Sequence, residues 1–221
     1  MNNNRVTVTR MVETRIPTLY GEFNLMLYAN SGDYKEHLAL VKGNPASETA
    51  PLVRFHSECF TGDVIGSLRC DCGDQFDLAM QKIADAGVGL IIYLRQEGRG
   101  IGLLDKLRAY NLQDIGYDTI DANIALGHAP DERNYAIAAH ILDDLNIRAV
   151  RLMTNNPAKI DALNQLGIDV KERIQLQTHA HPENAQYLLT KARRMSHRLN
   201  QSPLLEKTDG SSGNLNGNGR H

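Results

Sequence analysis

A short, nearly continuous apolar run at residues 88–94 (VGLIIYL) constrains the fold of this chain more than any other feature. The run lies between Gly87 and Arg95 and is shorter than a typical helix, so we interpret it as a β-strand buried on both faces. Residues 149–153 form a second strand of this kind. Such strands belong to parallel sheets that helices cover on each side.

Stretches with helical spacing alternate with these strands. Phe76, Met80 and Ile83 recur every three or four residues, which predicts a helix. A later helix has Asn156 as its N-cap, Pro at its first position and Gly167 at its end. The other expected elements are helices over residues 101–115 (through Leu103, Leu104 and Leu107), 131–145 and 182–199, and a strand over residues 170–176.

The first quarter of the chain has a different pattern. Residues 6–58 show strand-type alternation, as at Phe23, Leu25 and Leu27, and a turn cluster at residues 43–45 separates two short strands. Strands that alternate with helices predict an α/β fold. We expect a three-layer αβα architecture with a mixed, largely parallel sheet and a β-rich N-terminal part.

Composition favours one catalytic domain over residues 1–200. The 221 residues are 42% hydrophobic and carry a net charge of −2, so no nucleic-acid partner is expected. No stretch approaches the ~18 apolar residues of a membrane span, and residues 1–5 lack the apolar region of a signal peptide, so we expect no membrane partner and a cytoplasmic location. Residues 201–221, rich in Gly, Asn and Ser, are expected to be a disordered tail without a catalytic role.

All three cysteines of the chain lie within 14 residues, at Cys59, Cys70 and Cys72. Structural zinc sites are closed by four protein ligands, whereas catalytic zinc has three protein ligands and an open position for water. Zinc-bound water ionises near neutral pH and becomes a nucleophile. The spacing therefore favours a catalytic zinc site. Two alternatives stay open, namely unliganded core thiols and a structural site that His56 completes.

The segment LRQEGRGIGL at residues 94–103 joins the first buried strand to a helix. Its glycines expose backbone N–H groups beside a helix N-terminus, which is an arrangement that binds anions. Arg95 and Arg99 add guanidinium groups that match phosphate oxygens. Open α/β sheets bind ligands beyond the carboxyl ends of their strands, where this loop would lie. The alternative is a tight turn with solvated arginines.

A second strand–helix junction, at residues 153–157, repeats this arrangement and places Lys159 in the first turn of the helix. A cation there opposes the helix dipole, and an anionic ligand would relieve the conflict. Asp131 and Arg133 suggest an acid–base carboxylate beside a phosphate-binding arginine, and Tyr110 a hydrogen-bond donor. The alternatives are an exposed lysine, helix-start acids with a surface arginine, and a core tyrosine.

Four motifs resemble those of the GTP cyclohydrolase II family and occur in the family's order. They are RFHSECFTGDVIGSLRCDCGDQ (54–75), RQEGRGIGL (95–103), YDTIDAN…DERNY (117–135) and LMTNNPAKI (152–160). The resemblance runs from about residue 5 to residue 199. No part of the chain resembles dihydroxybutanone phosphate synthase, the second enzyme that some family members carry as a fusion.

The resemblance implies an enzyme that opens the imidazole ring of GTP and releases formate and pyrophosphate. Its product is 2,5-diamino-6-(5-phosphoribosylamino)pyrimidin-4(3H)-one, with which riboflavin biosynthesis begins. The resemblance further implies one zinc ion per subunit on Cys59, Cys70 and Cys72, Mg²⁺ with the triphosphate, and a homodimer.

The resemblance also implies roles for individual residues. Asp131 matches the family's proton acceptor, Arg133 the residue assigned as nucleophile at the α-phosphate, and Tyr110 a tyrosine that helps to complete ring opening. A guanidinium stays protonated at neutral pH, so an electrostatic clamp is the simpler role for Arg133, and both roles stay open. The implied GTP contacts are Arg54, Phe55, His56, Ser57, Glu58, Gln75, Glu97, Gly98, Arg99, Thr119, Thr154 and Lys159.

Other functions fit the sequence less well. A nucleobase deaminase needs a P-C-x-x-C signature, whereas Cys70 and Cys72 are spaced C-x-C and follow Arg69. A zinc module that binds nucleic acid would need a fourth cysteine and a positive charge. Two alternatives remain, namely a family member that binds GTP with incomplete turnover and another zinc-dependent nucleotide hydrolase.

Overall fold

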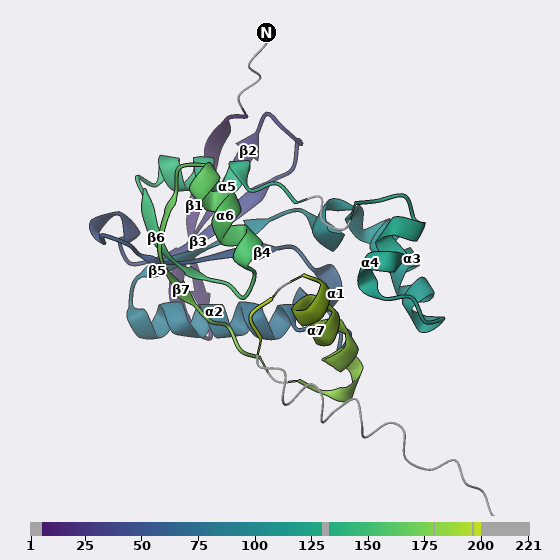
Figure 1. The fold of residues 1–221 in the computed structure, drawn as a ribbon. Coiled ribbons are helices and arrows are strands. Elements are labelled where there is room, and N and C mark those ends of the chain that lie inside the picture. Colours follow the sequence, from purple (N-terminus) through teal and green to yellow (C-terminus); the bar gives the residue numbers. More distant parts are fainter. Residues whose placement is uncertain (1–5, 130–132, 179, 196, 200–221) are drawn as a thin grey trace, which may run out of the picture.

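A mixed β-sheet runs through the centre of the molecule (Figure 1). The structure, a computed structural model, describes residues 6–129, 133–178, 180–195 and 197–199. Within these residues the sheet has seven strands in the order β1-β2-β3-β5-β4-β6-β7. The strands are β1 (Val8–Thr18), β2 (Gly21–Asn30), β3 (His37–Lys42), β4 (Leu52–Ser57), β5 (Gly89–Leu94), β6 (Ala149–Met153) and β7 (Asp169–Ile174).

The direction of pairing changes at β5. On one side, β1, β2, β3 and β5 pair antiparallel, and Val41 lies opposite Leu90. On the other side, β5, β4, β6 and β7 pair parallel, and Val53 lies opposite the same Leu90. The predicted mixed α/β sheet with a β-rich N-terminal part is thereby confirmed.

Helices cover both faces of the sheet, which gives the three predicted layers. Helix α2 lies on one face, and α5 and α6 lie on the other, whereas α3, α4 and α7 stand beside the sheet (Figure 1). No helix in the described part of the chain is long and apolar enough to cross a bilayer. The helices are α1 (Phe60–Asp63), α2 (Cys72–Ala86), α3 (Gly102–Asp114), α4 (Thr119–Ala125), α5 (Ala136–Asp144), α6 (Pro157–Gln165) and α7 (Pro182–Arg194), with 3-10 turns at Pro45–Ser47 and Glu97–Gly100.

Strand β5 is buried on both faces, as its apolar run predicts. Leu90 and Ile92 belong to the core under α5 and α6, and Ile91 belongs to the core under α2. All three side chains are fully buried. Successive side chains of a strand point to opposite faces, so a strand between two helical layers needs apolar residues at every position.

Helix α3 forms where the periodicity predicts it, but a different face is buried. Leu104 and Leu107 are 65% and 44% exposed, whereas Lys106 and Ala109 are buried. The buried face of α3 borders a polar cavity and not the apolar core. The spacing of the leucines therefore predicted the helix correctly but predicted the wrong buried face.

Two helix boundaries also differ from the prediction. Helix α5 begins at Ala136, because the side chain of Asn134 accepts a hydrogen bond from the Ala136 N–H (2.8 Å). Helix α7 ends at Arg194, and the backbone then turns so that the His197 N–H donates to the Lys191 carbonyl (3.1 Å). The first residues of the longer helix predicted over 131–145, and the whole predicted tail, lie outside the described residues.

Candidate functional site

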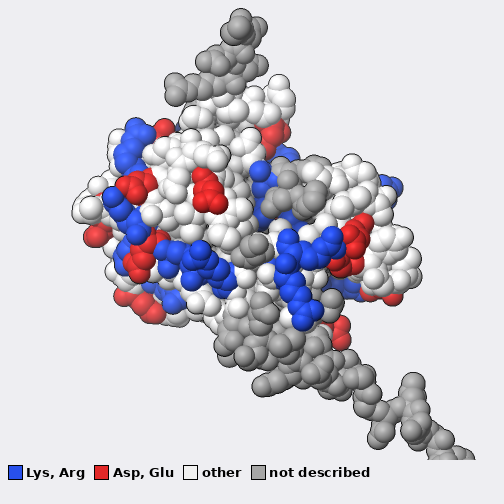
Figure 2. Space-filling model, in the orientation of Figure 1, with Lys and Arg blue, Asp and Glu red and all other residues white. Residues whose placement is uncertain are grey.

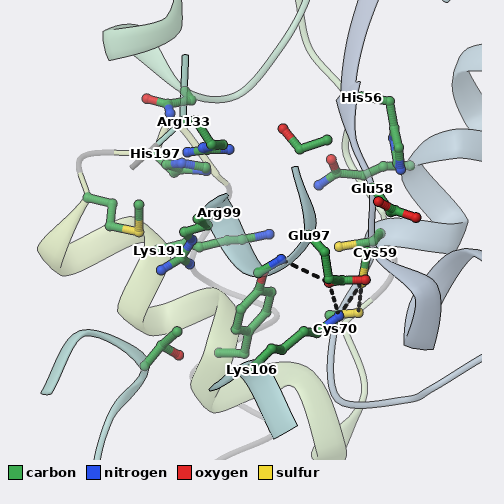
Figure 3. Close-up of a pocket in the computed structure, with 18 of the residues that line it drawn as sticks. His56, Glu58, Cys59, Cys70, Glu97, Arg99, Lys106, Arg133, Lys191 and His197 are labelled. Carbon is green, nitrogen blue, oxygen red and sulfur yellow. Dashed lines mark hydrogen bonds and ion pairs between the residues drawn. The ribbon is translucent and has the colours of Figure 1, made fainter. Parts of the chain in front are cut away.

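A cavity of about 1050 Å³, its open mouth included, lies where the carboxyl ends of β4, β5 and β6 meet. Residues that follow each of these strands line it, together with side chains from α2, α3, α4 and α7. Parallel strands end at one edge of a sheet, so their following loops converge there. Figure 3 shows the thiols and Glu97 on one side of the cavity and Arg133 and His197 on another.

Most of the predicted site residues line this one cavity. Phe55 does not, because its side chain is fully buried in the core. Its carbonyl oxygen accepts a hydrogen bond from a cavity residue, Lys159 (2.9 Å). Asp131 lies outside the described residues. Those that line the cavity are Arg54, His56, Ser57, Glu58, Cys59, Cys70, Cys72, Gln75, Glu97, Gly98, Arg99, Tyr110, Thr119, Arg133, Thr154 and Lys159.

The thiols of Cys59, Cys70 and Cys72 form a cluster of the size that zinc requires. Their sulfur atoms all lie within 4.8 Å of one another, and the Sγ atoms of Cys59 and Cys70 are 3.7 Å apart. Zinc–sulfur bonds of about 2.3 Å at tetrahedral angles separate two sulfurs by about 3.8 Å. The donor set and its spacing therefore fit a zinc ion with three protein ligands.

Gly62 lets the backbone approach this cluster closely. A Cβ at this position would lie 2.9 Å from Cys70 Sγ and 3.2 Å from Cys59 Sγ. Real Cβ atoms essentially never come within 3.0 Å of such a neighbour. The α1 turn that carries Gly62 thus packs directly on the sulfurs, and a larger residue at this position would displace them.

His56 does not belong to the cluster, because another group holds its ring. Its Nε2 lies 3.0 Å from both carboxylate oxygens of Asp63. Asp63 Oδ2 also accepts hydrogen bonds from Tyr93 Oη (2.8 Å) and Cys59 N (3.0 Å). Burial lowers the pKa of His56, so the ring is neutral at pH 7. This arrangement favours the open three-thiolate site over the structural four-ligand site.

Lys106 joins the thiol cluster to Glu97. Its Nζ donates to Cys59 Sγ (3.1 Å) and to Glu97 Oε1 (2.7 Å). Glu97 also accepts from the backbone N–H groups of Phe60 (2.6 Å) and Gly98 (2.9 Å). Burial alone would lower the pKa of Lys106, but the Cys59 thiolate and Glu97 raise it above its ordinary value. Lys106 is therefore a buried cation between two anionic groups.

The pKa of the Cys59 thiol agrees with the placement of Lys106 beside it. Hydrogen bonds from Cys70 and Cys72, followed by the ammonium of Lys106, lower the pKa of the Cys59 thiol against the effect of its burial. The contact with Cys59, together with burial, raises the pKa of the Cys70 and Cys72 thiols, so Cys59 is the thiol of the three that ionises first. Metal ligation requires the thiolate form. The surroundings of Cys59 thus favour the state that a metal ion needs.

The loop after β5 holds Arg99 in an unusual backbone conformation. Gly98 and Arg99 both have positive φ, at 62° and 65°. A left-handed conformation costs a residue other than glycine about 1–2 kcal/mol. Strain of this kind collects at ligand sites, and here it brings the Arg99 guanidinium to the cavity wall.

A buried polar chain crosses the floor of the cavity. Arg54 Nη2 donates to Gln75 Oε1 (2.5 Å), and Gln75 Nε2 donates to Asp71 Oδ2 (2.5 Å). Lys191 Nζ donates to Asp71 Oδ1 (2.8 Å) from helix α7. Burial would raise the pKa of Asp71, but Lys191 and Gln75 lower it. The residue between two of the cysteines therefore anchors a helix more than 100 residues away in sequence.

Four buried nitrogen atoms that border the cavity have no hydrogen-bond partner within the described part of the chain. They are Arg54 Nε, His56 Nδ1, Arg99 Nη1 and His197 Nε2. A buried polar atom without a partner costs about 1–3 kcal/mol, and such atoms are rare in folded proteins. Their concentration here indicates a place where a ligand supplies the missing partners.

Positive charge dominates the cavity. Figure 2 shows Lys and Arg side chains gathered between the sheet and the α3–α4 region. Only two carboxylates, those of Glu58 and Glu97, occur among the described lining residues. The cations in the lining are Arg54, Arg99, Lys106, Arg133, Lys159 and Lys191. Such a cavity suits a ligand with several negative charges.

Sequence reasoning missed several residues of this site. Asp71 lies between two cysteines, and Lys106 interrupts a run of leucines, so both carried a signal. Lys191 and His197 carried none, because only the folded chain brings them to the cavity. Asp63 does not line the cavity and belongs to the site only through its contact with His56.

The fold and site define an α/β protein that combines a three-thiol cluster with a cation-lined cavity. The sequence model of the GTP cyclohydrolase II family matches residues 9–175. The match covers well over half of the chain, and the chain belongs to this family.

Individual relatives agree with this membership. The chain is 53% identical over 193 residues to riboflavin biosynthesis protein RibBA of Bacillus cereus (strain B4264), covering 87% of this chain and 49% of the relative. It is 52% identical to the protein of the same name from Bacillus subtilis (strain 168), covering 87% and 48%. The chain thus spans about half the length of the curated relatives it matches.

A solved structure also aligns with part of the chain. It is RibBX, a two-domain 3,4-dihydroxy-2-butanone 4-phosphate synthase from A. baumannii. The alignment has a TM-score of 0.46 and 24% identity, and it covers 80% of this chain and 41% of that chain.

Proposed function

We propose that this chain is a GTP cyclohydrolase II that hydrolyses GTP to formate, pyrophosphate and 2,5-diamino-6-(5-phosphoribosylamino)pyrimidin-4(3H)-one. The observation that carries the proposal is the three-thiol cluster in the wall of a cavity lined by six cations. Family membership and relatives named for riboflavin biosynthesis support the same reaction and its place at the start of that pathway.

Cys59, Cys70 and Cys72 would hold the zinc ion. With three protein ligands the site would leave room for water, and zinc bound there would supply the Lewis acidity that makes water a nucleophile near neutral pH. Lys106 offsets part of the negative charge of the thiolates and holds Glu97 at the same wall. Guanine C8 is a weak electrophile and needs a strong nucleophile, which zinc would supply. We therefore place the guanine base against this wall.

Cations on the other walls would bind the triphosphate. Arg99 presents a buried Nη1 without a partner in the described chain, and Arg133 and Lys159 line the same cavity. Pyrophosphate leaves as an anion, and fixed positive charges stabilise the charge that develops on its oxygens. Mg²⁺ would share this role with the triphosphate.

Tyr110 would donate a hydrogen bond beside the thiol cluster. Its hydroxyl lies 3.2 Å from Thr61 Oγ1, which in turn lies 3.7 Å from Cys59 Sγ. Burial raises the pKa of Tyr110, so the hydroxyl keeps its proton at neutral pH. Asp131 is retained as the predicted proton acceptor.

Arg133 is retained as a catalytic residue with two possible roles. A protonated guanidinium stabilises negative charge, and the cationic surroundings of Arg133 agree with a clamp on the α-phosphate. A covalent role would require the guanidinium to lose its proton. Mass spectrometry of enzyme quenched during turnover distinguishes the two, since only nucleophilic attack at the α-phosphate leaves the nucleoside monophosphate covalently attached to the protein.

The homodimer is also part of the proposal. Leu104, Ile115 and Ile124 are 54–73% exposed on α3, α4 and the segment between them. Apolar surface of this kind is typical of protein contacts. Sedimentation equilibrium of the purified chain tests the dimer directly, and a monomer at all concentrations would contradict it.

One assay tests the proposed reaction. The purified protein is incubated with GTP, Mg²⁺ and Zn²⁺, and formate, pyrophosphate and ammonia are measured. We expect equal amounts of formate and pyrophosphate and no ammonia. Pyrophosphate without formate would leave only nucleotide hydrolysis, and ammonia would indicate a deaminase.

Cys70→Ser tests the metal site in the same assay. The variant should lose formate release, whereas Ser47→Ala, at an exposed turn outside the cavity, should match the wild type. Formate release by Cys70→Ser at the wild-type rate would show that the thiol cluster does not carry the reaction.

A further inference from the structure

The C-terminal part of the described chain forms a wall of the cavity. Helix α7 and the residues after it lie beyond residue 175, where the family match ends. Even so, Tyr187, Lys191, Met195 and His197 all line the cavity. This wall is therefore part of the site, although neither the motifs of the chain nor the family match point to it.

Contacts on three sides hold the wall in place. Lys191 forms the buried ion pair with Asp71, between Cys70 and Cys72. Arg194 pairs with Asp118 at the start of α4. Beyond the helix, the Arg198 N–H donates to the carbonyl of Asn155 (2.9 Å), in the loop between β6 and α6. The wall thus connects the start of α2, the start of α4 and the loop between β6 and α6.

His197 is the residue of this wall whose chemistry is unused. Its Nε2 is buried at the cavity and has no hydrogen-bond partner in the part of the chain that the structure describes. Figure 3 places His197 beside Arg133, across the cavity from Cys59 and Cys70. The ring therefore faces the side of the cavity that we assign to the phosphates.

The surroundings of His197 identify the kind of ligand. Burial, and then the charges of Lys191, Arg133, Lys159 and Arg99, lower the pKa of His197 to about 3. The ring is neutral at pH 7, and with its proton on Nε2 it offers one N–H donor toward the cavity, among several cations. Oxygens of an anion satisfy such a donor, whereas a ligand with a net positive charge would be repelled by the same neighbours.

We propose that His197 contacts the phosphate groups of the bound nucleotide and that α7 forms a wall of the triphosphate site. The inference rests on the proposed function, because GTP supplies the phosphates. The Lys191–Asp71 pair then has a second consequence, since it fixes the phosphate wall to the start of α2, where Asp71 lies between Cys70 and Cys72.

Calorimetric titration of the zinc-loaded full chain tests this role. The probes are a GTP analogue with a methylene group in place of the α–β bridging oxygen, and guanosine, which has no phosphate. The variants are His197→Ala, His197→Gln, whose amide nitrogen lies near the position of Nε2, and His140→Ala, a histidine of α5 outside the cavity. Zinc content and thermal unfolding are measured for each variant.

His197→Ala should bind the analogue about tenfold to a hundredfold more weakly, the range expected for a hydrogen bond to a charged group. Its affinity for guanosine should stay within about twofold of the wild type. His197→Gln should recover most of the loss, and His140→Ala should match the wild type.

Two results would overturn the inference while the proposed function stands. One is analogue binding by His197→Ala within about twofold of the wild type. The other is an equal loss for the analogue and for guanosine, which indicates a general packing role. Failure of the wild type itself to bind the analogue would reject the proposed function and this inference together.

Discussion

Replacing Lys106 by Met tests the central electrostatic feature of the site. The substitution keeps the length and apolar stem of the side chain and removes its ammonium. Lys106 is 8% exposed, and its Nζ donates to Cys59 Sγ at 3.1 Å and to Glu97 Oε1 at 2.7 Å. The change therefore leaves a buried thiolate and a buried carboxylate without their shared cation.

The size of the effect follows from these contacts. Removing one partner of a buried ion pair costs about 3–5 kcal/mol, because the remaining charge stays buried. Glu97 keeps hydrogen bonds from Phe60 N and Gly98 N, so we expect the lower end, about 3 kcal/mol in the free energy of unfolding. Lost support of a metal ligand weakens metal binding by about tenfold to a hundredfold.

Two measurements check these values. Urea denaturation, followed by circular dichroism, gives the free energy of unfolding, and competition with a chromophoric chelator gives the zinc affinity. Lys35→Met, at an exposed lysine outside the cavity, is the matched control and should leave both quantities unchanged. Lys106→Arg keeps the charge and should retain more zinc affinity than Lys106→Met.

The reasoning fails if Lys106→Met keeps wild-type zinc affinity within about twofold and wild-type stability within about 0.5 kcal/mol. Such a result would mean that solvent screens the thiolate and Glu97 despite their burial. A loss of stability with unchanged zinc affinity would limit the role of Lys106 to Glu97.

Three further predictions follow from single contacts. Gly62→Ala would place a methyl group 2.9 Å from Cys70 Sγ. Overpacking of this kind costs about 1–3 kcal/mol, so zinc affinity in the chelator assay should fall by at least about fivefold and by up to about a hundredfold. Tyr110→Phe removes a donor beside the thiol cluster, so kcat for formate release should fall by about a hundredfold with little change in KM, and an unchanged kcat would remove Tyr110 from the mechanism. Asp144→Ala removes the carboxylate that accepts from the buried Tyr28 hydroxyl (2.7 Å), which should cost about 1–3 kcal/mol in urea denaturation at pH 7. Burial would raise the pKa of Asp144, but hydrogen bonds from Arg10 and Tyr28 lower it below its ordinary value. The ionised Asp144 therefore stabilises the folded protein fully above the unfolded pKa of ~3.9, and this stabilisation is lost as the carboxylate is protonated at lower pH. The wild type and Asp144→Ala should converge in their free energy of unfolding as the pH falls below about 4.

Much of the architecture could be predicted because local patterns determine it. The run at residues 88–94 predicts a strand buried on both faces, and the Asn156-Pro157 pair predicts the start of α6, where the Asn156 side chain accepts from the Ala158 N–H (3.0 Å). These features depend on neighbours in sequence. The antiparallel placement of β3 against β5 could not be read this way, because it depends on a pairing of distant segments.

The site residues that belong to recognisable motifs could be predicted from the sequence, whereas its buried charged residues could not. The thiols and the Gly98-Arg99 loop lie in recognisable segments. Helix α3 shows the limit of periodicity, since Lys106 is buried and Leu104 is exposed. A hydrophobic stripe indicates the inner face of a helix only when that face meets an apolar core. His197 and Lys191 become site residues only through tertiary contacts.

The clustering of the thiols within residues 59–72 has a consequence for folding. The parallel half of the sheet needs pairings such as that of Leu52 with Arg151, which close long loops and therefore form slowly. The cysteine segment needs no such closure and can capture zinc in a chain that has not yet folded. An ion that binds both states would stabilise the native fold by less than its affinity for the finished site suggests.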